Sequence, residues 1–348
     1  MRNLRFLIVV GLAGLGMGHA QENLEPLPVP LTNNVVVALK VSGQTLVYSF
    51  MGLDSSKKPD GVKNSSYALN LKYNKWTTIR SVQGPGRLGA TAAGVGEEIF
   101  VIGGFVPDKS GLQAILADVS VYSPLALRWY RGPDLLTPVR DAMSAEYRER
   151  YIYVVGGFSK SGPTNDVQLY DTASKEWSKA TAYPGPAVFG HAGTIVGDTI
   201  IYVDGAKASG ATQGARYVPS DECWMGKIDR KDPKKITWSK LPAHPGTARY
   251  RIAAGAGDKE GKAYFAGGSD IIYDYAGVGL DGTGAEPSPV VFDFSLKRNA
   301  WETILDKDPT PTMDHHGMAV TSDGLIVVGG MAKGQKVTAA VRGLPKGK

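Results

Sequence analysis

Cysteine is almost absent from this sequence, because its 348 residues include a single one, Cys223. One thiol cannot form an intramolecular disulfide, so strand pairing and packing must hold the fold, and we expect Cys223 to be buried filler. After residue 20 the chain also lacks an apolar run long enough to cross a bilayer and any long helical periodicity. The sequence therefore predicts an all-β protein with no membrane span.

A strong charge of either sign is also absent, since the formal net charge is +6. The densest basic run, 230–235, contains a proline and precedes a predicted strand, so a solvated turn explains it better than a nucleic-acid site does. After residue 20 the chain has four His and no carboxylate at ligand spacing. We expect no nucleic-acid partner, no metal and no cofactor.

The first 20 residues follow the order of a secretory signal peptide. Arg2 and Arg5 precede the apolar run Phe6–Met17, and Gly18-His19-Ala20 ends the segment with small residues. We predict that residues 1–20 are cleaved, that residues 21–348 form one domain, and that the protein is periplasmic or secreted.

A β-branched and aromatic run that stops at a Gly pair recurs along the chain. The clearest copy is Tyr151–Phe158, and six copies, some degraded, lie 48 to 63 residues apart. Each unit reads as four strands; in the third they are Asp141–Glu146, Tyr151–Val155, Asp166–Tyr170 and a strand around Trp177. A Trp recurs in the fourth strand of five units, at Trp76, Trp129, Trp177, Trp238 and Trp301.

These Gly pairs and spaced Trp residues resemble the kelch family of β-propellers. The resemblance implies a six-bladed kelch β-propeller. The sixth unit ends without a Trp strand, and Leu24–Leu31 precedes the first unit. We expect this N-terminal segment to supply the missing outer strand and to close the ring.

Loop length predicts which end of the propeller is functional. The loops 206–221 and 269–288 are long, and the starts of the first strands open onto the same end. Arg87, Arg140 and Arg251 each lie 16 residues before a Gly pair, so we expect a ring of guanidinium groups that binds an anion. Pairing of each Arg with a neighbouring blade is the alternative.

Two further groups are candidates for substrate binding at this end. His191 and His315 lie near the starts of first strands, although a structural role suits such His residues as well. Tyr273 lies in the loop Ser269–Ser288, which also holds several carboxylates. That composition suits stacking on a sugar, and it equally suits a loop that packs on itself.

Among kelch proteins, the chain looks most like the periplasmic N-acetylneuraminate epimerases (sialic acid mutarotases). The resemblance implies a catalytic Glu in an Asn-Gly-Glu-Ala-Lys segment, followed by a catalytic Arg. Here the segment reads Asp204-Gly205-Ala206-Lys207, and Arg216 follows. The Glu position is thus Ala206, and Asp204 is the local candidate for the acid/base partner of Arg216.

Two functions remain open at this point. One is an isomerase that interconverts the anomers of an acidic sugar. The other is a non-catalytic module that binds a carbohydrate or a protein partner on the loop-rich end. A general acid/base near the anomeric centre would distinguish the enzyme from the module.

Overall fold

Strands account for nearly all regular structure in this protein. The computed structural model describes residues 24–108, 113–212, 215–257 and 259–347. Within these ranges the helical elements are two short 3-10 turns, η1 (Pro59–Gly61) and η2 (Lys333–Gln335). None of the described helices could span a membrane. The all-β prediction is confirmed, while the predicted signal peptide, residues 1–20, lies outside the described residues.

Most strands belong to antiparallel four-stranded sheets in which neighbours in sequence pair. The first sheet contains β1 (Val35–Val41), β2 (Gln44–Leu53), β3 (Val62–Asn70) and β4 (Lys75–Ile79). The second contains β5 (Thr91–Val95), β6 (Glu98–Ile102), β9 (Val119–Ser123) and β10 (Arg128–Gly132). The third contains β11 (Met143–Tyr147), β12 (Tyr151–Val155), β15 (Val167–Asp171) and β16 (Glu176–Ala180).

The second half of the chain repeats this arrangement. The fourth sheet contains β18 (Ala192–Val196), β19 (Thr199–Val203), β22 (Cys223–Ile228) and β23 (Ile236–Leu241). The fifth contains β24 (Ala253–Gly257), β25 (Lys262–Ala266), β26 (Val291–Ser295) and β27 (Ala300–Leu305). The sixth has three strands among the described residues, β28 (Ala319–Val320), β29 (Leu325–Val328) and β32 (Val341–Leu344).

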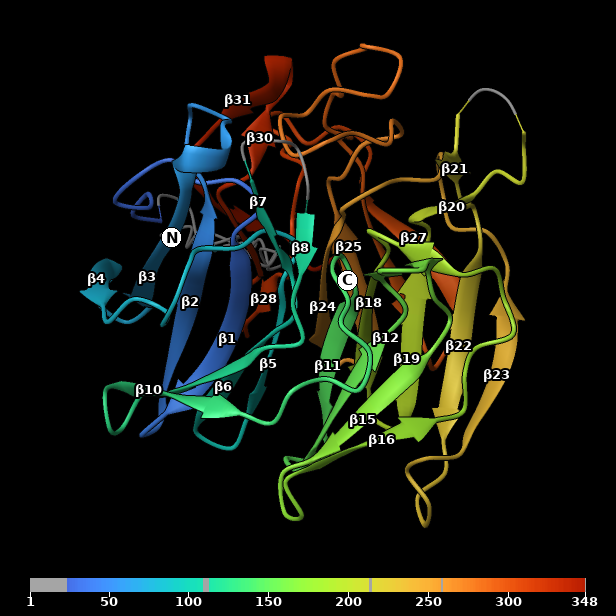
Figure 1. The fold of residues 1–348 in the computed structure, drawn as a ribbon, viewed down its shortest axis with the longest axis horizontal. Coiled ribbons are helices and arrows are strands. Elements are labelled where there is room, and N and C mark those ends of the chain that lie inside the picture. Colours follow the sequence, from blue (N-terminus) through green and yellow to red (C-terminus); the bar gives the residue numbers. More distant parts are fainter. Residues whose placement is uncertain (1–23, 109–112, 213–214, 258, 348) are drawn as a thin grey trace, which may run out of the picture.

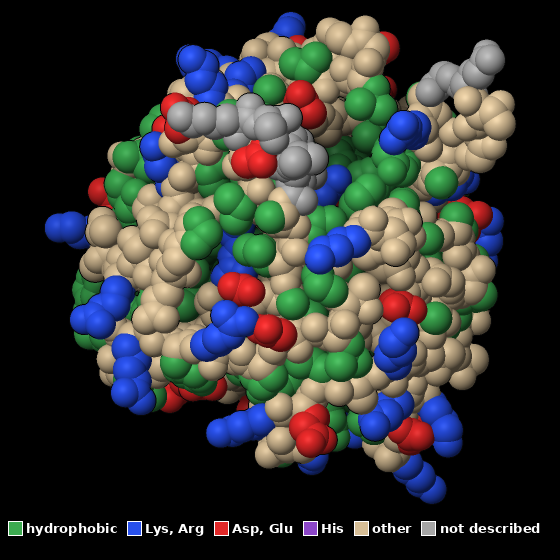
Figure 2. Space-filling model, viewed as in Figure 1, with side chains coloured by type: hydrophobic (Ala, Val, Ile, Leu, Met, Phe, Trp, Pro, Cys, Tyr) green, Lys and Arg blue, Asp and Glu red, His purple; other side chains and the backbone are tan. Residues whose placement is uncertain are grey.

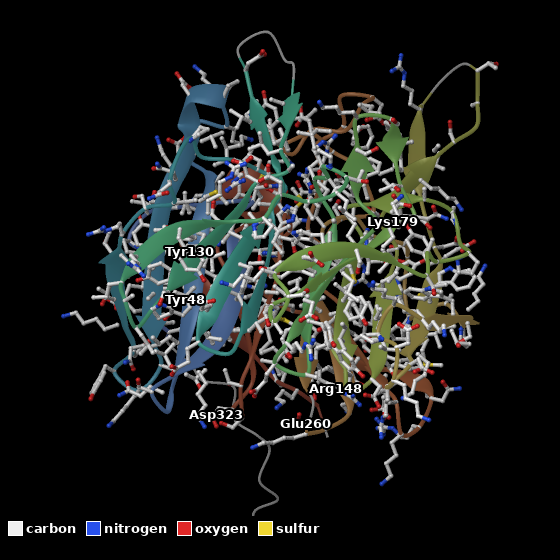
Figure 3. The ribbon with its side chains drawn as sticks, turned by 60° about the horizontal axis from the view of Figure 1, so that its bottom comes forward. Tyr48, Tyr130, Arg148, Lys179, Glu260 and Asp323 are labelled. Atoms are coloured by element: carbon white, nitrogen blue, oxygen red, sulfur yellow. The ribbon has the colours of Figure 1, made fainter. Side chains whose placement is uncertain are left out.

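Short strands in the loops, most of them between the second and third strands of a sheet, gather at one end of the molecule (Figure 1). They are β7 (Phe105–Pro107) with β8 (Gln113–Ile115), β13 (Phe158–Ser159) with β14 (Gly162–Pro163), β17 (Val188–Phe189) with β20 (Ala206–Ala208) and β21 (Tyr217–Pro219), and β30 (Met331–Ala332) with β31 (Lys336–Val337). We call this end the loop end. The turns at the opposite end carry charged residues such as Arg148, Glu260 and Asp323 (Figure 3).

The repeated Trp residues join neighbouring sheets. Each indole Nε1–H donates to the backbone oxygen of the first residue after the outer strand of the preceding sheet. The pairs are Trp129 with Arg80 (2.7 Å), Trp177 with Pro133 (2.9 Å), Trp238 with Thr181 (3.0 Å) and Trp301 with Pro242 (2.8 Å). Trp76 of the first sheet donates to Glu25, near the N-terminus, at 2.8 Å.

The segment Leu24–Leu31 is irregular and does not form the strand that the sequence predicts. Prolines at positions 26, 28 and 30 have no N–H group, so the segment cannot donate regularly to a strand ladder. Instead, the N–H of Leu27 donates to the carbonyl of Ala339 at 2.8 Å. Asp308 contacts Pro289 in the same way after the outer strand of the fifth sheet. The N-terminal segment therefore takes the place of a connection that follows an outer strand.

Six residues with positive φ surround the loop end of the channel between the sheets. They are Asn33, Gly89, Asp141, Gly190, Arg251 and Asp314, with φ between 51° and 70°. Backbone hydrogen bonds link neighbours among them, from Asn33 N to Asp314 O, Asp141 N to Gly89 O, Gly190 N to Asp141 O and Arg251 N to Gly190 O. Because a left-handed conformation is costly for residues other than Gly, close contacts must hold the four that are not Gly in place.

Candidate functional site

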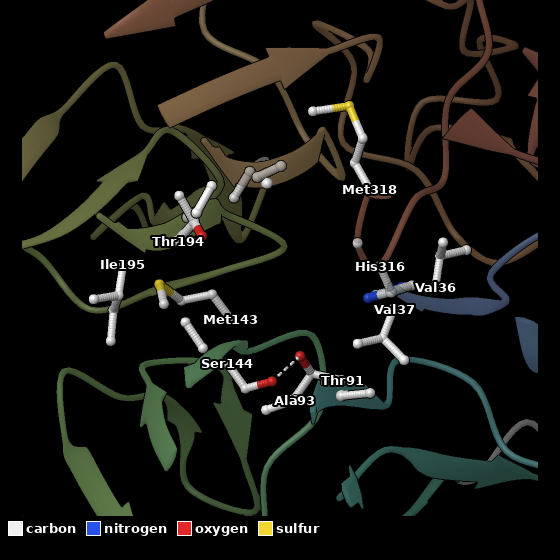
Figure 4. Close-up of a pocket in the computed structure, with 18 of the residues that line it drawn as sticks. Val36, Val37, Thr91, Ala93, Met143, Ser144, Thr194, Ile195, His316 and Met318 are labelled. Carbon is white, nitrogen blue, oxygen red and sulfur yellow. Dashed lines mark hydrogen bonds between the residues drawn. The ribbon is translucent and has the colours of Figure 1, made fainter. Parts of the chain in front are cut away.

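The first strands of all six sheets face one central channel, whose volume is about 260 Å³. Figure 4 shows side chains such as Met143 and Met318 pointing into it. The hydroxyl groups of Thr91 and Ser144 form a 2.7 Å hydrogen bond between two neighbouring strands. Small and aliphatic side chains make up most of the wall, so the channel offers few charged groups to a ligand.

Three His residues line the loop end of the channel, namely the buried His191 and His315 and the partly buried His316, whose side chain is 5% exposed. Burial lowers the pKa of His191 to about 4 and that of His315 to about 3. Burial also lowers the pKa of His316, whose Nε2 has no hydrogen-bond partner. These imidazoles are therefore neutral at pH 7 and would not attract an anion.

A buried ion network covers the loop end of the channel. The Nε of Arg251 donates to Oδ1 of Asp141 at 3.0 Å, and its Nη1 donates to Oδ1 of Asp314 at 2.7 Å. Asp314 also accepts bonds from Thr32 Oγ1 at 2.7 Å and Asn33 Nδ2 at 2.9 Å. Both carboxylates are fully buried, and Arg251 is 3% exposed. Arg251 is thus committed to the protein's own carboxylates.

Electrostatics within this network favour the charged forms. Burial alone would raise the pKa of Asp141, but the guanidinium groups of Arg251 and Arg140 outweigh it and hold that pKa well below its usual range. Burial alone would lower the pKa of Arg251, but Asp141, Tyr250 and Asp314 together outweigh it and hold that pKa above its ordinary value. The network is therefore a set of paired charges at neutral pH.

Arg140 differs from Arg251 because part of its guanidinium group is exposed. Its Nη1 contacts Oδ2 of Asp141, its Nε has no partner, and the side chain is 12% exposed. The guanidinium carbon lies over three rings, 5.1 Å from the centroid of Phe105, 4.4 Å from Phe158 and 5.7 Å from Phe189. Figure 2 shows the surface hollowed at the loop end, with hydrophobic side chains in the hollow.

Further rings pack around Phe158 and Phe189 to form an aromatic layer above the ion network. The ring centroid of Phe189 lies 5.1 Å from that of Tyr217 and 5.0 Å from that of Phe158. Tyr250 continues the layer at 5.7 Å from Phe189, and Tyr273 follows at 5.3 Å from Tyr250. Arg140 with this layer is the arrangement that could receive a ligand carrying both an anionic and an apolar face.

The three predicted arginines do not occupy equivalent positions. In each of the three units, one residue donates its backbone N–H to the carbonyl of the residue that follows the Gly pair. This donor is Leu88 in the second sheet's unit, Arg140 in the third and Tyr250 in the fifth. Arg87 therefore precedes this position, and Arg251 follows it. Counting back from the Gly pair misaligned the three arginines, because the number of residues between the first and second strands differs between the units. The intervening residues are 96–97, 148–150 and 258–261.

Arg87 is 2% exposed and binds the protein itself. Its Nη1 donates to the carbonyl of Gly103 at 3.3 Å, and its Nη2 donates to Ser120 Oγ at 2.8 Å. This arrangement matches the structural alternative that the sequence left open for each Arg. The structure therefore does not bring the three guanidinium groups together at one anion site.

The predicted catalytic pair is also not brought together. Asp204 is fully buried, and its Oδ2 accepts bonds from His244 Nε2 at 2.7 Å and from the backbone N–H of Arg249 at 2.9 Å. Arg216 is exposed just before β21. Ala206, where the resemblance implied a Glu, is fully buried in the aromatic layer beside Phe189.

The loop Ser269–Ser288 packs largely on itself. Tyr273 is 3% exposed, and its ring lies 5.4 Å from the guanidinium carbon of Arg251. Asp274 Oδ1 accepts bonds from the N–H groups of Ala276 at 2.8 Å and Val278 at 3.1 Å. Tyr273 thus supports the ion network from above, and Asp274 holds a turn.

Sequence reasoning missed the groups that organise this end. Asp141 and Asp314 each come shortly before a first strand, next to residues that the repeat alignment singled out. A search for carboxylates beside the predicted arginines would have found Asp141. The phenylalanines come from three different loops, so no local pattern brings them together.

Comparison with known proteins places the repeats in a family. The family model described as "KLHDC2/KLHL20/DRC7 Kelch-repeats domain" matches residues 36–268. Kelch-like protein 34 from Homo sapiens is 28% identical over 191 residues, which are 53% of this chain and 28% of that protein. Kelch-like protein terF from Aspergillus terreus is 24% identical over 273 residues, 76% of this chain and 54% of that protein. The chain thus spans about half or less of the length of these relatives.

A solved structure shares the fold over nearly the whole chain. The structure of YjhT aligns with a TM-score of 0.71 and 18% identity, covering 91% of this chain and 95% of YjhT. At this identity the likeness concerns the fold alone.

Proposed function

This chain belongs to the kelch-repeat family, and we propose from that premise that it is a carbohydrate-binding β-propeller whose loop end takes an acidic sugar. The observation that carries the proposal is the partly exposed side chain of Arg140, whose guanidinium carbon lies over the half-buried ring of Phe158 and near the buried rings of Phe105 and Phe189. A guanidinium binds a carboxylate through paired hydrogen bonds, and aromatic rings stack on the apolar face of a sugar. The Arg140 side chain is 12% exposed, whereas Arg87 and Arg251 are 2% and 3% exposed and committed to the protein.

Six blades in a closed ring are part of this proposal. The indole of Trp76 meets Glu25 as the other four indoles meet the ends of preceding outer strands. By this equivalence the segment Leu24–Leu31 occupies the place of the connection that follows an outer strand in the other sheets. We expect a chain that begins at Thr32 to melt far below one that begins at Gln21, because it loses this connection and bares an edge. Equal melting temperatures would contradict the closure.

Export is proposed on the residues alone. The order of charged, apolar and small residues in 1–20 supports cleavage after Ala20 and a periplasmic or secreted protein. The intact mass of the protein recovered from the extracytoplasmic fraction checks this. A mass that includes residues 1–20 would contradict it.

The ligand proposal is tested by calorimetric titration with N-acetylneuraminate and with the neutral sugar N-acetylmannosamine. We expect the acidic sugar to bind, its affinity to fall as salt rises, and the neutral sugar to bind at least tenfold more weakly. Arg140→Gln should abolish the preference and Arg140→Lys should keep part of it. Arg150→Gln, at the opposite end of the molecule, is the matched control. Equal binding of both sugars would overturn the proposal.

Interconversion of anomers is the second candidate function. It is favoured by one observation, that His316 Nε2 has no hydrogen-bond partner and lies 3.7 Å from Asp141 Oδ1 at the loop end of the channel. Such a pair could move a proton in a general acid/base step. Exchange of N-acetylneuraminate anomers, followed by NMR, should then be faster than in buffer and at least tenfold slower with His316→Gln. Binding without acceleration would leave the non-catalytic module.

A further inference from the structure

Three side chains with metal-binding atoms meet between the fourth and fifth sheets. Asp204 follows β19, Cys223 begins β22, and His244 lies in the connection before β24. One ligand atom from each lies within 4.8 Å of the others, and all three residues are buried. Among the described residues, this is the one such group of three or more His, Cys, Asp and Glu side chains.

Hydrogen bonding within the cluster fixes its protons. Nδ1 of His244 lies 2.8 Å from the carbonyl oxygen of Pro245, which can only accept, so Nδ1 must carry a proton. Nε2 lies 2.7 Å from Oδ2 of Asp204. One proton must therefore lie between Nε2 and Oδ2, whichever of the two atoms holds it. The imidazole and carboxylate together have no net charge.

The remaining atoms of the cluster are under-used. Oδ1 of Asp204 is buried and has no hydrogen-bond partner, although the carboxylate is fully enclosed. An unpaired buried acceptor of this kind is costly unless something else satisfies it. Cys223 is 1% exposed, and a thiol buried without a metal keeps its proton at neutral pH.

We propose that Asp204, Cys223 and His244 form a binding site for a divalent transition metal, with Zn²⁺ as the best match. A carboxylate oxygen, a thiolate and an imidazole nitrogen are all zinc ligands. A tetrahedral ion with bonds of about 2.0–2.3 Å separates its ligand atoms by roughly 3.3–3.8 Å, so shifts of about 1 Å suffice.

Charge balance supports the assignment. The ion replaces the thiol proton and the proton shared by Asp204 and His244, and both protons pass to solvent. A carboxylate and a thiolate then neutralise the divalent cation, so the cluster has no net charge before or after binding. The nearby positive charge of Arg249 is no obstacle, because it meets a neutral cluster in both states. Metal binding that left a net charge on this buried cluster would be strongly unfavourable, so the exchange must be balanced in this way.

The surroundings would hold the imidazole rigidly. The ring of His244 stacks on Phe292 with centroids 4.5 Å apart and an interplanar angle of 15°. Trp301 meets the same ring edge-on at 6.0 Å. The N–H group of Arg249 bonds Oδ2 of Asp204, which orients the carboxylate. Such supporting contacts restrict the ligands to one geometry.

The test uses the full chain without a polyhistidine tag, refolded with Co²⁺ or Zn²⁺ and then desalted. We expect about one metal ion per chain by elemental analysis, a thiolate-to-cobalt charge-transfer band, and about two protons released per ion at pH 7. Cys223 is the only cysteine in the sequence, so the charge-transfer band reports on this site alone.

Cys223→Ser and His244→Gln should each lower the affinity for Zn²⁺ at least tenfold, whereas His191→Gln, a buried His in the channel, should leave it unchanged. Circular dichroism establishes that each variant folds. If Asp204→Asn fails to fold, the cobalt band of the parent chain decides the question. A parent chain that keeps no metal, or equal uptake by Cys223→Ser and the parent, would overturn the proposal.

Discussion

Removing the guanidinium of Arg251 should be among the most damaging single changes in this protein. Arg251→Met keeps much of the side-chain length but leaves Asp141 and Asp314, both fully buried, without their shared cation. Breaking a buried ion pair by removing one partner costs about 3–5 kcal/mol, since the remaining charge stays in the interior. Asp141 keeps Arg140, and Asp314 keeps Thr32, so the lower half of this range is expected.

The cost should also depend on pH. Without Arg251 the folded-state pKa of the buried Asp141 carboxyl rises, so the folded variant takes up a proton there more readily than the unfolded chain does. Stability of the variant relative to the parent therefore recovers as pH falls from 7 towards 5. Arg150→Met supplies the control, because Arg150 pairs with Asp171 at the surface, where an ion pair contributes about 0–1 kcal/mol.

Urea unfolding followed by fluorescence at pH 7 and pH 5 measures both effects. Asp141→Asn in the Arg251→Met background should restore part of the lost stability, because it removes one stranded charge. If Arg251→Met costs no more than Arg150→Met, or if its cost is the same at both pH values, the ion network does not stabilise the fold in the way described.

Two further predictions concern the backbone and the channel. Gly190→Ala should lower the free energy of unfolding by several kcal/mol, because the new Cβ would lie 1.9 Å from Tyr250 Cε2. Gly96→Ala, at a similar positive φ with open space around it, should lower it by about 1 kcal/mol. Equal losses for the two variants in urea unfolding would contradict this packing. Stability should fall as pH drops from 6.5 to 4, since the unfolded chain protonates His191 in this window while the folded one, with its pKa of about 4, does not. His191 accounts for roughly 3 kcal/mol of this loss in the free energy of unfolding. The melting temperature of His191→Gln should therefore fall less between pH 6.5 and pH 4 than that of the parent.

Much of the fold follows from the sequence because the repeat signals are local. The run Tyr151–Val155 was predicted as a strand and is β12, residue for residue. The predicted strand Asp141–Glu146 instead begins at Met143, as β11. Asp141 has a φ of 51° and bonds across to Gly89, so it belongs to the ring at the channel end and cannot continue a strand. The alternation of apolar and polar residues that predicts a strand does not reveal where a residue takes a positive φ.

The site was harder to predict because it depends on register between units. A difference of one residue in a turn moved Arg87 and Arg251 to opposite sides of the Arg140 position, and each then met a different environment. Asp204 was chosen for its distance along the chain from Ala206. Its side chain points instead toward the fifth sheet, where His244 lies 40 residues further along the chain. Spacing within one unit could not reveal a partner from the next.

The division between the ion network and the aromatic layer also limits how function can vary in this protein. Arg251, Asp141 and Asp314 join strands from different sheets, so substitutions there disturb the scaffold before they alter a ligand. The aromatic layer comes from loops whose lengths differ between units, and Ala206 lies in it beside Phe189. We therefore expect the proposed acidic sugar to be recognised by the loops and by Arg140.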